Sequence, residues 1–407
     1  MNKIQPVTFG PKHHFFGFHD LCPWDISGRY MLAMETDFID RPPKAGDKAK
    51  ICLIDLENNN KLEVLAETDA WNFHQGCRAQ WLPNDPEKII YNDRRSNKFI
   101  SVVFDVKNRK EINVLKCPIY AISPKGDFGL GLNFARLKRY GGYGYAGEVE
   151  EPESDGIFMV DFVSGTTNLI IPVENGHILT HIAFNPGGSR ICFIDKYRLP
   201  DGGFLQRLIT ANPDGADLYV LPSHASHFDW KSDTEILVYG KFSPKITAFR
   251  KMGAFRIPIL KPILYFVRKM RGLIKQKIAG QSYFLLKDKT QNVERVAVGL
   301  MTEDGHPQFS SDGKWVITDT YPDKNHERTL ILYDWENKKR INLGEFYSLP
   351  HRKSLANYHS DESWDISEMR SDLHPRWNRS GTQACIDSVH EGTRQIYIAQ
   401  IDNSFAA

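Results

Sequence analysis

Four histidines recur at the same place relative to an aromatic residue, in the pattern His-x-x-[Phe/Trp]. They are His181 in HIAF, His227 in HFDW, His306 in HPQF and His374 in HPRW. Chance placement is a poor explanation, because the 407 residues include only 14 histidines. Imidazoles that converge from four repeats can bind a transition metal or transfer protons. We therefore take these positions as the centre of a candidate site.

Acidic and basic side chains recur close to this pattern. Two of the histidines lie in Asp-x-His-Pro, as Asp304–His306 and Asp372–His374, and Arg78 takes the histidine position in another repeat. The second strand-like run of a repeat returns antiparallel to the first, so its last residues reach the same rim. The polar residues expected there include Arg94, Arg95, Arg136, Lys196, Arg198 and Tyr321.

Three chemistries suit such a rim. Neutral imidazoles with a carboxylate bind Zn, Mn, Fe or Ni, and the candidate ligands are His227, His306, His374 and Asp372. An imidazole, or the phenol of Tyr321, can act as a general base. Guanidinium groups bind a carboxylate or a phosphate through two parallel hydrogen bonds.

Together these chemistries fit β-elimination from an acidic sugar. A cation neutralises the uronate carboxylate, which acidifies the proton on C5; an imidazole then removes that proton, and the glycosidic oxygen leaves from C4. The residues expected to be catalytic are His181, His227, Arg78 and Tyr321. Those expected to bind the substrate are Arg94, Arg95, Arg136, Lys196, Arg198 and Arg376.

A repeat must position these residues. An aromatic or apolar residue, a turn with Gly or Pro and a β-rich run occur seven times, beginning at Trp24, Trp81, Ile122, Phe184, Trp230, Phe309 and Trp377. Each is followed by a second pair of strand-like runs, as in 50–65, 101–115, 156–171 and 330–344. Alternating apolar residues around polar turns are typical of hairpins.

Four strands per unit, repeated seven times, predict an all-β fold: a seven-bladed β-propeller, as one domain over residues 1–407. The first strand of each blade would line the central channel and bring the histidines to one mouth. The last unit ends after its third strand at 394–401, and the opening run 4–9 can supply the fourth strand. An open sandwich is the alternative.

The longest gap between units, 243–280, carries ten Lys or Arg and no acidic residue. Pro258 and Pro262 interrupt it, and no uncharged run reaches the length that spans a membrane. We expect a basic, amphipathic and helical insertion between the fifth and sixth blades. It is either a peripheral contact with an anionic membrane surface or a helical lid, and the sequence leaves both open.

Composition narrows the class of protein. A net charge of +2 argues against nucleic acid as a partner. The six scattered cysteines suit buried reduced thiols. The first ten residues contain no apolar signal segment, which favours the cytoplasm, with peripheral contact at the inner membrane through 243–280. No G-x-S-x-G elbow, P-loop or dinucleotide fingerprint is found in the sequence.

The repeat resembles that of the oligogalacturonate lyase family and of related TolB-like propellers. The resemblance rests on GHPQFSSDGKWVITD (305–319) and LHPRWNRSGTQACIDSVHEGTRQIYIAQI (373–401), and it is clearest from His181 onward. It implies that one blade histidine is the base and that others, with a Gln, bind a divalent metal, typically manganese. Segments such as FGFHD and WNFHQG also resemble bacterial sequences linked to surface-polysaccharide genes.

One part of the chain departs from that family. The last metal motif of the family resembles Q-x-x-H-x-H, and the matching stretch here runs from Ser371 to Arg376. Only His374 is retained, because Arg376 replaces the second histidine. The metal site is therefore absent, or it is rebuilt from His227, His306 and Asp372.

Two functions follow from these patterns. The first is a lyase, or another carbohydrate-active enzyme, that acts on an acidic polysaccharide or oligosaccharide. The second is a non-catalytic propeller that binds a glycan or a protein during surface-polysaccharide assembly at the membrane, with 243–280 as its docking segment. A TolB-like propeller that accompanies a peptidase is a weaker third, since no hydrolase domain is recognised in the sequence.

Overall fold

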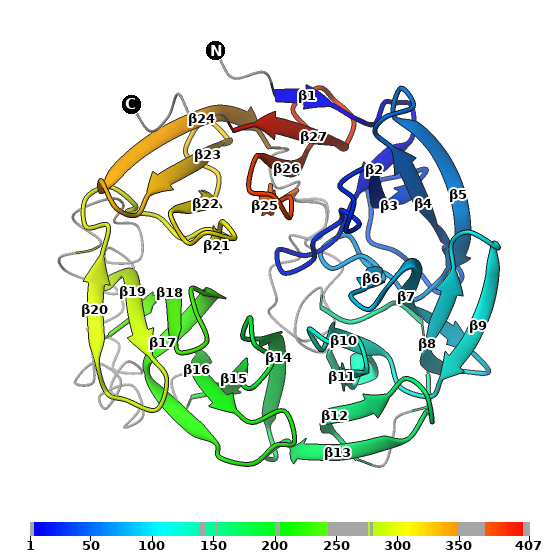
Figure 1. Ribbon diagram of the computed structural model, residues 1–407, viewed down its shortest axis with the longest axis horizontal. Coiled ribbons are helices and arrows are strands. Elements are labelled where there is room, and N and C mark those ends of the chain that lie inside the picture. The colour runs from blue at the N-terminus through cyan, green and yellow to red at the C-terminus, as the bar shows by residue number, and fades with distance from the viewer. Residues whose placement is uncertain are drawn as a thin grey trace, which may run out of the picture.

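The computed structural model describes residues 4–137, 143–147, 149–150, 154–199, 204–242, 276, 280–348 and 371–401. Within these ranges the chain is almost entirely β-structure, with the short helix α1 (Phe134–Leu137) after one strand. The sheets stand in a ring around a common axis, like the blades of a propeller (Figure 1). The expected all-β propeller architecture is therefore confirmed, and an open sandwich is not observed.

Five sheets have four antiparallel strands each, and one edge strand of each sheet lies on the inside of the ring (Figure 1). The first sheet holds β2 (His13–Phe15), β3 (Tyr30–Thr36), β4 (Ala49–Asp55) and β5 (Lys61–Thr68). The second holds β6 (Gln80–Leu82), β7 (Asp85–Arg95), β8 (Lys98–Asp105) and β9 (Lys110–Leu115). The third holds β10 (Ile119–Ile122), β11 (Phe128–Leu132), β12 (Gly156–Asp161) and β13 (Thr167–Pro172).

The last two four-stranded sheets come from the C-terminal part of the chain. One holds β21 (Gln308–Phe309), β22 (Trp315–Asp319), β23 (Glu327–Asp334) and β24 (Lys339–Tyr347). The other holds β25 (Arg376–Trp377), β26 (Gln383–Ser388), β27 (Gln395–Gln400) and β1 (Ile4–Pro6). Because Ile4 pairs with Ala399, the N-terminal run completes the C-terminal sheet, as the sequence predicted.

A seven-stranded sheet joins two repeats that the sequence predicted as separate blades. It holds β14 (His177–Phe184), β15 (Ile191–Arg198), β16 (Phe204–Ala211), β17 (Tyr219–Trp230), β18 (Glu235–Lys241), β19 (Gln281–Lys287) and β20 (Val293–Val296). The first half of β17 pairs with β16 and its second half with β18. One long strand thus serves both repeats, and six sheets are found in the described residues.

Three of the tryptophans that begin a repeat donate a hydrogen bond to the backbone of the preceding repeat. The indole N–H of Trp81 donates to the backbone oxygen of Pro23 over 2.8 Å, and that of Trp377 donates to Gln308 over 3.2 Å. Trp230 makes the same kind of contact to Ala183. Each of these three indoles is buried and its N–H group has an acceptor. Burial of the apolar ring therefore stabilises the fold without leaving a buried donor unpaired. This contact explains the choice of tryptophan at the start of these three repeats.

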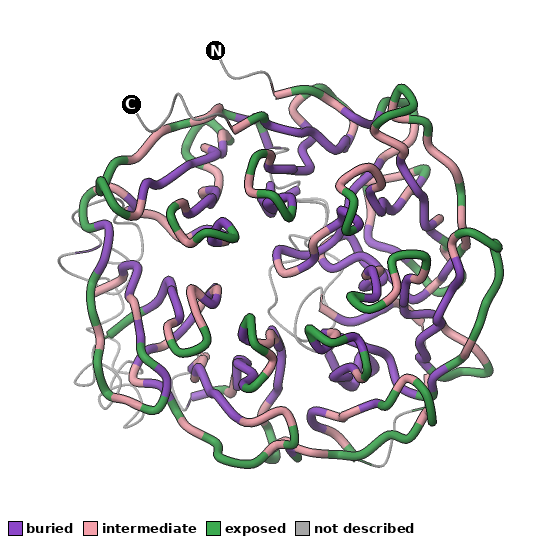
Figure 2. The backbone as a smooth tube through the Cα atoms, viewed as in Figure 1, coloured by how far each residue is buried: buried purple, intermediate pink, exposed green. Residues whose placement is uncertain are grey.

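The core lies between adjacent sheets, and the outermost strands face solvent (Figure 2). The central strand β8 is buried at all but one position, whereas the outer strand β9 is mostly exposed. All six cysteines are free, and all but Cys22 are buried. No helix among the described residues is long and apolar enough to cross a membrane. The expected insertion 243–280 falls outside the described residues, apart from Gln276 and Gly280.

Candidate functional site

A fifth histidine, His19, lies at the centre of the four predicted ones. It belongs to the link between β2 and β3, which extends into the middle of the ring (Figure 1). Its ring centroid lies 5.2 Å from those of His227 and His306, 5.6 Å from His181 and 6.1 Å from His374. All five rings are buried. The structure therefore brings the four predicted histidines together around a residue that the repeat did not single out.

The four predicted histidines also contact one another in sequence order. Ring centroids are 6.2 Å apart for His181 and His227, 4.3 Å for His227 and His306, and 4.5 Å for His306 and His374. Tyr321 lies beside this row, 6.3 Å from His227 and 6.0 Å from His306. The row is continuous because the histidines occupy equivalent positions on neighbouring inner strands.

The backbone at this shared position is irregular. Arg78, His181 and His374 adopt left-handed φ values of 57°, 56° and 45°. Such values are uncommon for residues other than glycine and carry strain. The pairing of β14 with β15 shifts register between Thr180 and Ala183, and a bulge of this kind redirects a side chain. The side chains therefore face the channel at the cost of regular strand geometry.

Hydrogen bonds to Nδ1 orient the imidazoles. His374 Nδ1 donates to the backbone oxygen of Gly17 over 3.0 Å, and His306 Nδ1 donates to Asp319 over 2.8 Å. His227 Nδ1 lies 3.1 Å from Asp304. A proton on Nδ1 leaves the lone pair on Nε2, where it can bind a metal or accept a proton. Within the described part of the chain, four buried Nε2 atoms lack a hydrogen-bond partner: those of His19, His181, His306 and His374.

Burial and neighbouring charges set the protonation of these rings. Burial, together with the imidazole of His227, holds the pKa of His19 and of His181 well below the usual value. Burial and His306 do the same for the pKa of His374. At His227 burial also opposes the charged form, but the carboxylate of Asp304 outweighs it and raises the pKa. The site thus combines neutral imidazoles with one basic imidazole.

Two groups of side chains place their ligand atoms within 4.8 Å of one another, as a metal site requires. The first, which we call the His19 cluster, consists of His19, His181 and His227. The second, the His374 cluster, consists of His74, Asp372 and His374. The four ligands expected from the sequence are therefore not gathered in one set. His227 belongs to the first cluster, Asp372 and His374 to the second, and His306 to neither.

The sequence reasoning missed His19 and His74 because they lie outside the register of the repeat. His19 precedes Trp24 by five residues and His74 precedes Trp81 by seven, where the pattern requires three. Both come from longer links between strands rather than from the inner strands themselves. Their segments FGFHD and WNFHQG were the available signal, because each places a histidine after a buried aromatic residue.

The arginines expected on the rim are held by acidic side chains. Arg78 is fully buried and donates to both carboxylate oxygens of Asp20, over 2.7 and 2.8 Å. The carboxylates that pair with the others are Asp69 for Arg94, Asp93 and Glu111 for Arg95, and Asp155 for Arg136. Arg78 thus resembles a structural residue more than the catalytic one expected, because its guanidinium already has a carboxylate partner.

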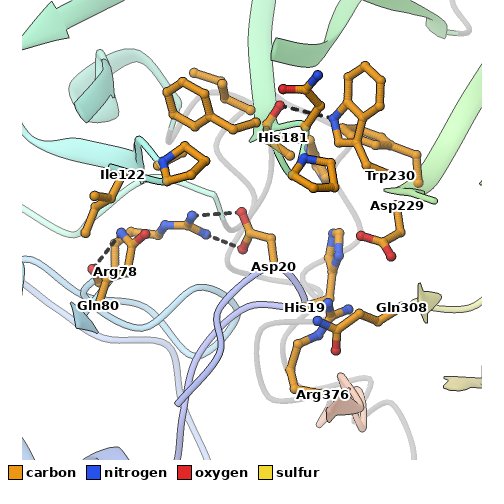
Figure 3. Close-up of a pocket in the computed structure, with 18 residues that line it drawn as sticks. His19, Asp20, Arg78, Gln80, Ile122, His181, Asp229, Trp230, Gln308 and Arg376 are labelled. Carbon is orange, nitrogen blue, oxygen red and sulfur yellow. Dashed lines mark hydrogen bonds and ion pairs between the residues drawn. The ribbon is translucent and has the colours of Figure 1, made fainter. Parts of the chain in front are cut away.

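The remaining expected residues lie in two other places. Lys196 and Arg198 lie over the ring of Phe204, at 5.0 and 4.9 Å from its centroid, and burial lowers the pKa of Lys196 to about 8. Arg376 is buried in a cavity of about 290 Å³, which is lined by His19 and His181 as well (Figure 3). Arg376 therefore shares a cavity with His19 and His181.

Comparisons with known proteins show the fold. No protein-family model matches the sequence, and no curated protein matches it. An oligogalacturonate lyase in complex with manganese superposes with a TM-score of 0.67 and 13% identity, over 99% of this chain and 94% of that chain. An oligogalacturonate lyase from Vibrio parahaemolyticus gives 0.63 and 15%, over 99% and 95%. The β-propeller domain of the Trilobed protease from Pyrococcus furiosus gives 0.53 and 11%, over 95% of each chain. The expected resemblance to oligogalacturonate lyase is thus confirmed at the level of the fold.

Proposed function

We propose that this protein is a carbon–oxygen lyase that cleaves an acidic, uronate-containing glycan by β-elimination. The observation that carries the proposal is the group of five buried imidazoles made up of His19 and the row around it, and four of the five have Nε2 atoms without a partner among the described residues. The fold shared with two oligogalacturonate lyases supports it. We further propose that the ring comprises seven four-stranded units, two of which share β17.

The His19 cluster fits a divalent cation. Its three donors are imidazole nitrogens, and burial keeps His19 and His181 neutral, as metal ligands must be. Asp304 supports His227 from behind, in the way that an outer carboxylate orients a ligating histidine. A cation bound there, manganese being the one we expect, would supply positive charge for the uronate carboxylate.

The general base in this proposal is His306. Its Nδ1 is fixed by Asp319, so its Nε2 presents a lone pair to the interior of the site. The carboxylate of Asp319 also stabilises the imidazolium that forms when His306 accepts the C5 proton. The sequence had favoured His181, His227 or Tyr321 for this role, whereas in this proposal His181 and His227 are ligands of the cation.

The proposal is tested by product formation. The protein is freed of metal with EDTA, divided, and incubated with polygalacturonate or another uronate-containing glycan, with and without added Mn²⁺. We expect absorbance from the unsaturated uronate to rise only in the sample with Mn²⁺. If no glycan in a broad uronate panel gives this absorbance with any divalent cation, the lyase proposal is wrong, and glycan binding without turnover would then favour the non-catalytic alternative.

A further inference from the structure

The cavity that contains Arg376 is a second feature of the channel. It lies between the inner strands of five sheets, with His19 and His181 at one end and Trp230 and Pro186 among its other lining residues (Figure 3). Its volume of about 290 Å³ is at the lower limit of small-molecule sites and suits a ligand of monosaccharide size. The nature of its polar groups indicates what that ligand is.

Arg376 and Arg78 both line this cavity and are both almost completely buried, yet only Arg78 has a carboxylate partner. Nε and Nη2 of Arg376 have no hydrogen-bond partner within the described ranges. Burial lowers the pKa of Arg376, which shows that desolvation of its charge is not offset. A buried guanidinium without acceptors is costly, and its Nε–Nη2 edge matches the two oxygens of a carboxylate.

The side chain of Asp229 lines the same cavity (Figure 3). It accepts the backbone N–H of Phe309 over 2.8 Å, and burial raises its pKa to about 6 although Arg376 acts in the other direction. The two side chains influence each other, but no ion pair between them is found in this part of the structure. The gap between them is the space that a ligand would fill.

The other polar groups restrict the class of ligand. Asp20 and Asp229 can accept hydrogen bonds from hydroxyl groups, and the side-chain amides of Gln80 and Gln308 also line the cavity. A phosphate dianion would be repelled by the two carboxylates, whereas a singly charged ligand with several hydroxyls matches every group.

We propose that this cavity binds a small hydroxy-carboxylate of the sugar-acid type, whose carboxylate contacts Nε and Nη2 of Arg376 and whose hydroxyls contact Asp20 and Asp229. The inference deepens the proposed function and rests on it for the class of ligand, and it adds Arg376 as the residue that binds the carboxylate. Within an oligosaccharide such a ligand corresponds to a uronate unit held next to the histidines.

Titration calorimetry on the full chain, kept metal-free with EDTA, tests this site with galacturonate as the probe. We expect wild type to bind galacturonate, and Arg376→Gln to bind it about 10- to 100-fold more weakly, since a charge-assisted pair is lost. Arg379→Gln is the matched control: it removes an exposed guanidinium three residues away and should bind like wild type. Arg376→Lys keeps the positive charge but cannot form two parallel hydrogen bonds, so its affinity for galacturonate should lie between those of wild type and Arg376→Gln. This second variant keeps the test valid if Arg376→Gln does not fold.

Three results would overturn the inference: no binding by wild type, equal binding by Arg376→Gln, or equal binding of neutral galactose. Tighter binding of inorganic phosphate than of galacturonate would show that the class of ligand is wrong. Circular dichroism of each variant verifies that it is folded. Because the measurement needs neither metal nor turnover, a failed elimination assay leaves this result standing, and a failed titration leaves the lyase proposal standing.

Discussion

The two clusters of the channel differ in how their charges are balanced. The His19 cluster contains only imidazoles, and its nearest carboxylate, Asp304, stands behind His227 rather than among the donors. In the His374 cluster one of the possible metal ligands is a carboxylate, that of Asp372. Arg328 contacts this carboxylate at 2.6 Å, and both side chains are fully buried. The carboxylate of the second cluster is therefore already paired with a cation, whereas no arginine forms an ion pair with a ligand of the first cluster in the described ranges.

This difference shows that geometry alone does not identify a metal site. Both clusters satisfy the same distance requirement, but binding a metal at Asp372 means competing with a buried guanidinium. Removing one member of a buried ion pair leaves the other uncompensated, which costs about 3–5 kcal/mol. None of the three ligands of the His19 cluster forms an ion pair with an arginine in the described ranges, although Arg376 lines the same cavity, and on this ground we propose the His19 cluster as the cation site.

The largest expected effect is at His306, which lies between the clusters, 4.3 Å from the ring of His227 and 4.5 Å from that of His374. Loss of a general base lowers turnover by about 10²- to 10⁴-fold. We expect His306→Gln to lower kcat in this way while Mn²⁺ binding stays close to wild type. His326→Asn, at an exposed turn, is the control with normal kcat. Loss of Mn²⁺ binding in His306→Gln would place His306 among the ligands instead.

The next effect separates the two clusters directly. His181 and His374 occupy the same position of the repeat, are both buried and both have a left-handed backbone, so asparagine is tolerated equally at each. We expect His181→Asn to weaken Mn²⁺ binding by more than about 100-fold, because a ligand is lost, and His374→Asn to change it by less than about threefold. The EPR signal of free Mn²⁺ measures both. The reverse ranking would assign the cation to the His374 cluster.

A smaller effect is expected from the carboxylate behind the His19 cluster. Asp304→Asn keeps the shape of the side chain but removes the charge that raises the pKa of His227. Loss of such an outer carboxylate weakens metal binding by about 10- to 100-fold. The exposed Asp214→Asn serves as the control, again with Mn²⁺ titration as the measurement. An unchanged affinity would show that Asp304 does not support a bound cation.

The histidines of the inner surface could be predicted from the sequence, because they occur at the same position of four repeats. His181, His227, His306 and His374 share a register, and a common register on neighbouring strands guarantees proximity. His19 could not be predicted in this way, because it lies in the link after β2. That link enters the channel, but its sequence does not follow the repeated pattern. The proposal that His19, His181 and His227 bind the cation rests on this central place of His19.

The charges of the rim were harder to predict than its shape. Arg78 and Arg94 look alike in the sequence, as basic residues at strand ends, but their partners Asp20 and Asp69 come from links outside the repeat. Whether an arginine is available to a ligand depends on such partners, so only the structure separates Arg78 from Arg376. The shared strand β17 was missed for a related reason: a twelve-residue strand and two shorter strands have the same alternation.

The smallest expected effect concerns the cavity on the Arg376 side of His19. Burial raises the pKa of Asp229 to about 6, so this carboxyl is ionised at pH 7.5 and largely protonated at pH 5. Its negative charge opposes an anionic ligand, and removing it gains on the order of 1 kcal/mol, or roughly a fivefold gain in affinity. We therefore expect galacturonate to bind more tightly as the pH falls through 6, since its own carboxylate remains ionised over that range. In Asp229→Asn the affinity should already be high at pH 7.5 and should no longer depend on pH there. If wild type instead binds more weakly at pH 5, the hydrogen bonds that ionised Asp229 accepts from the ligand hydroxyls outweigh its repulsion of the ligand carboxylate, and the predicted direction is wrong.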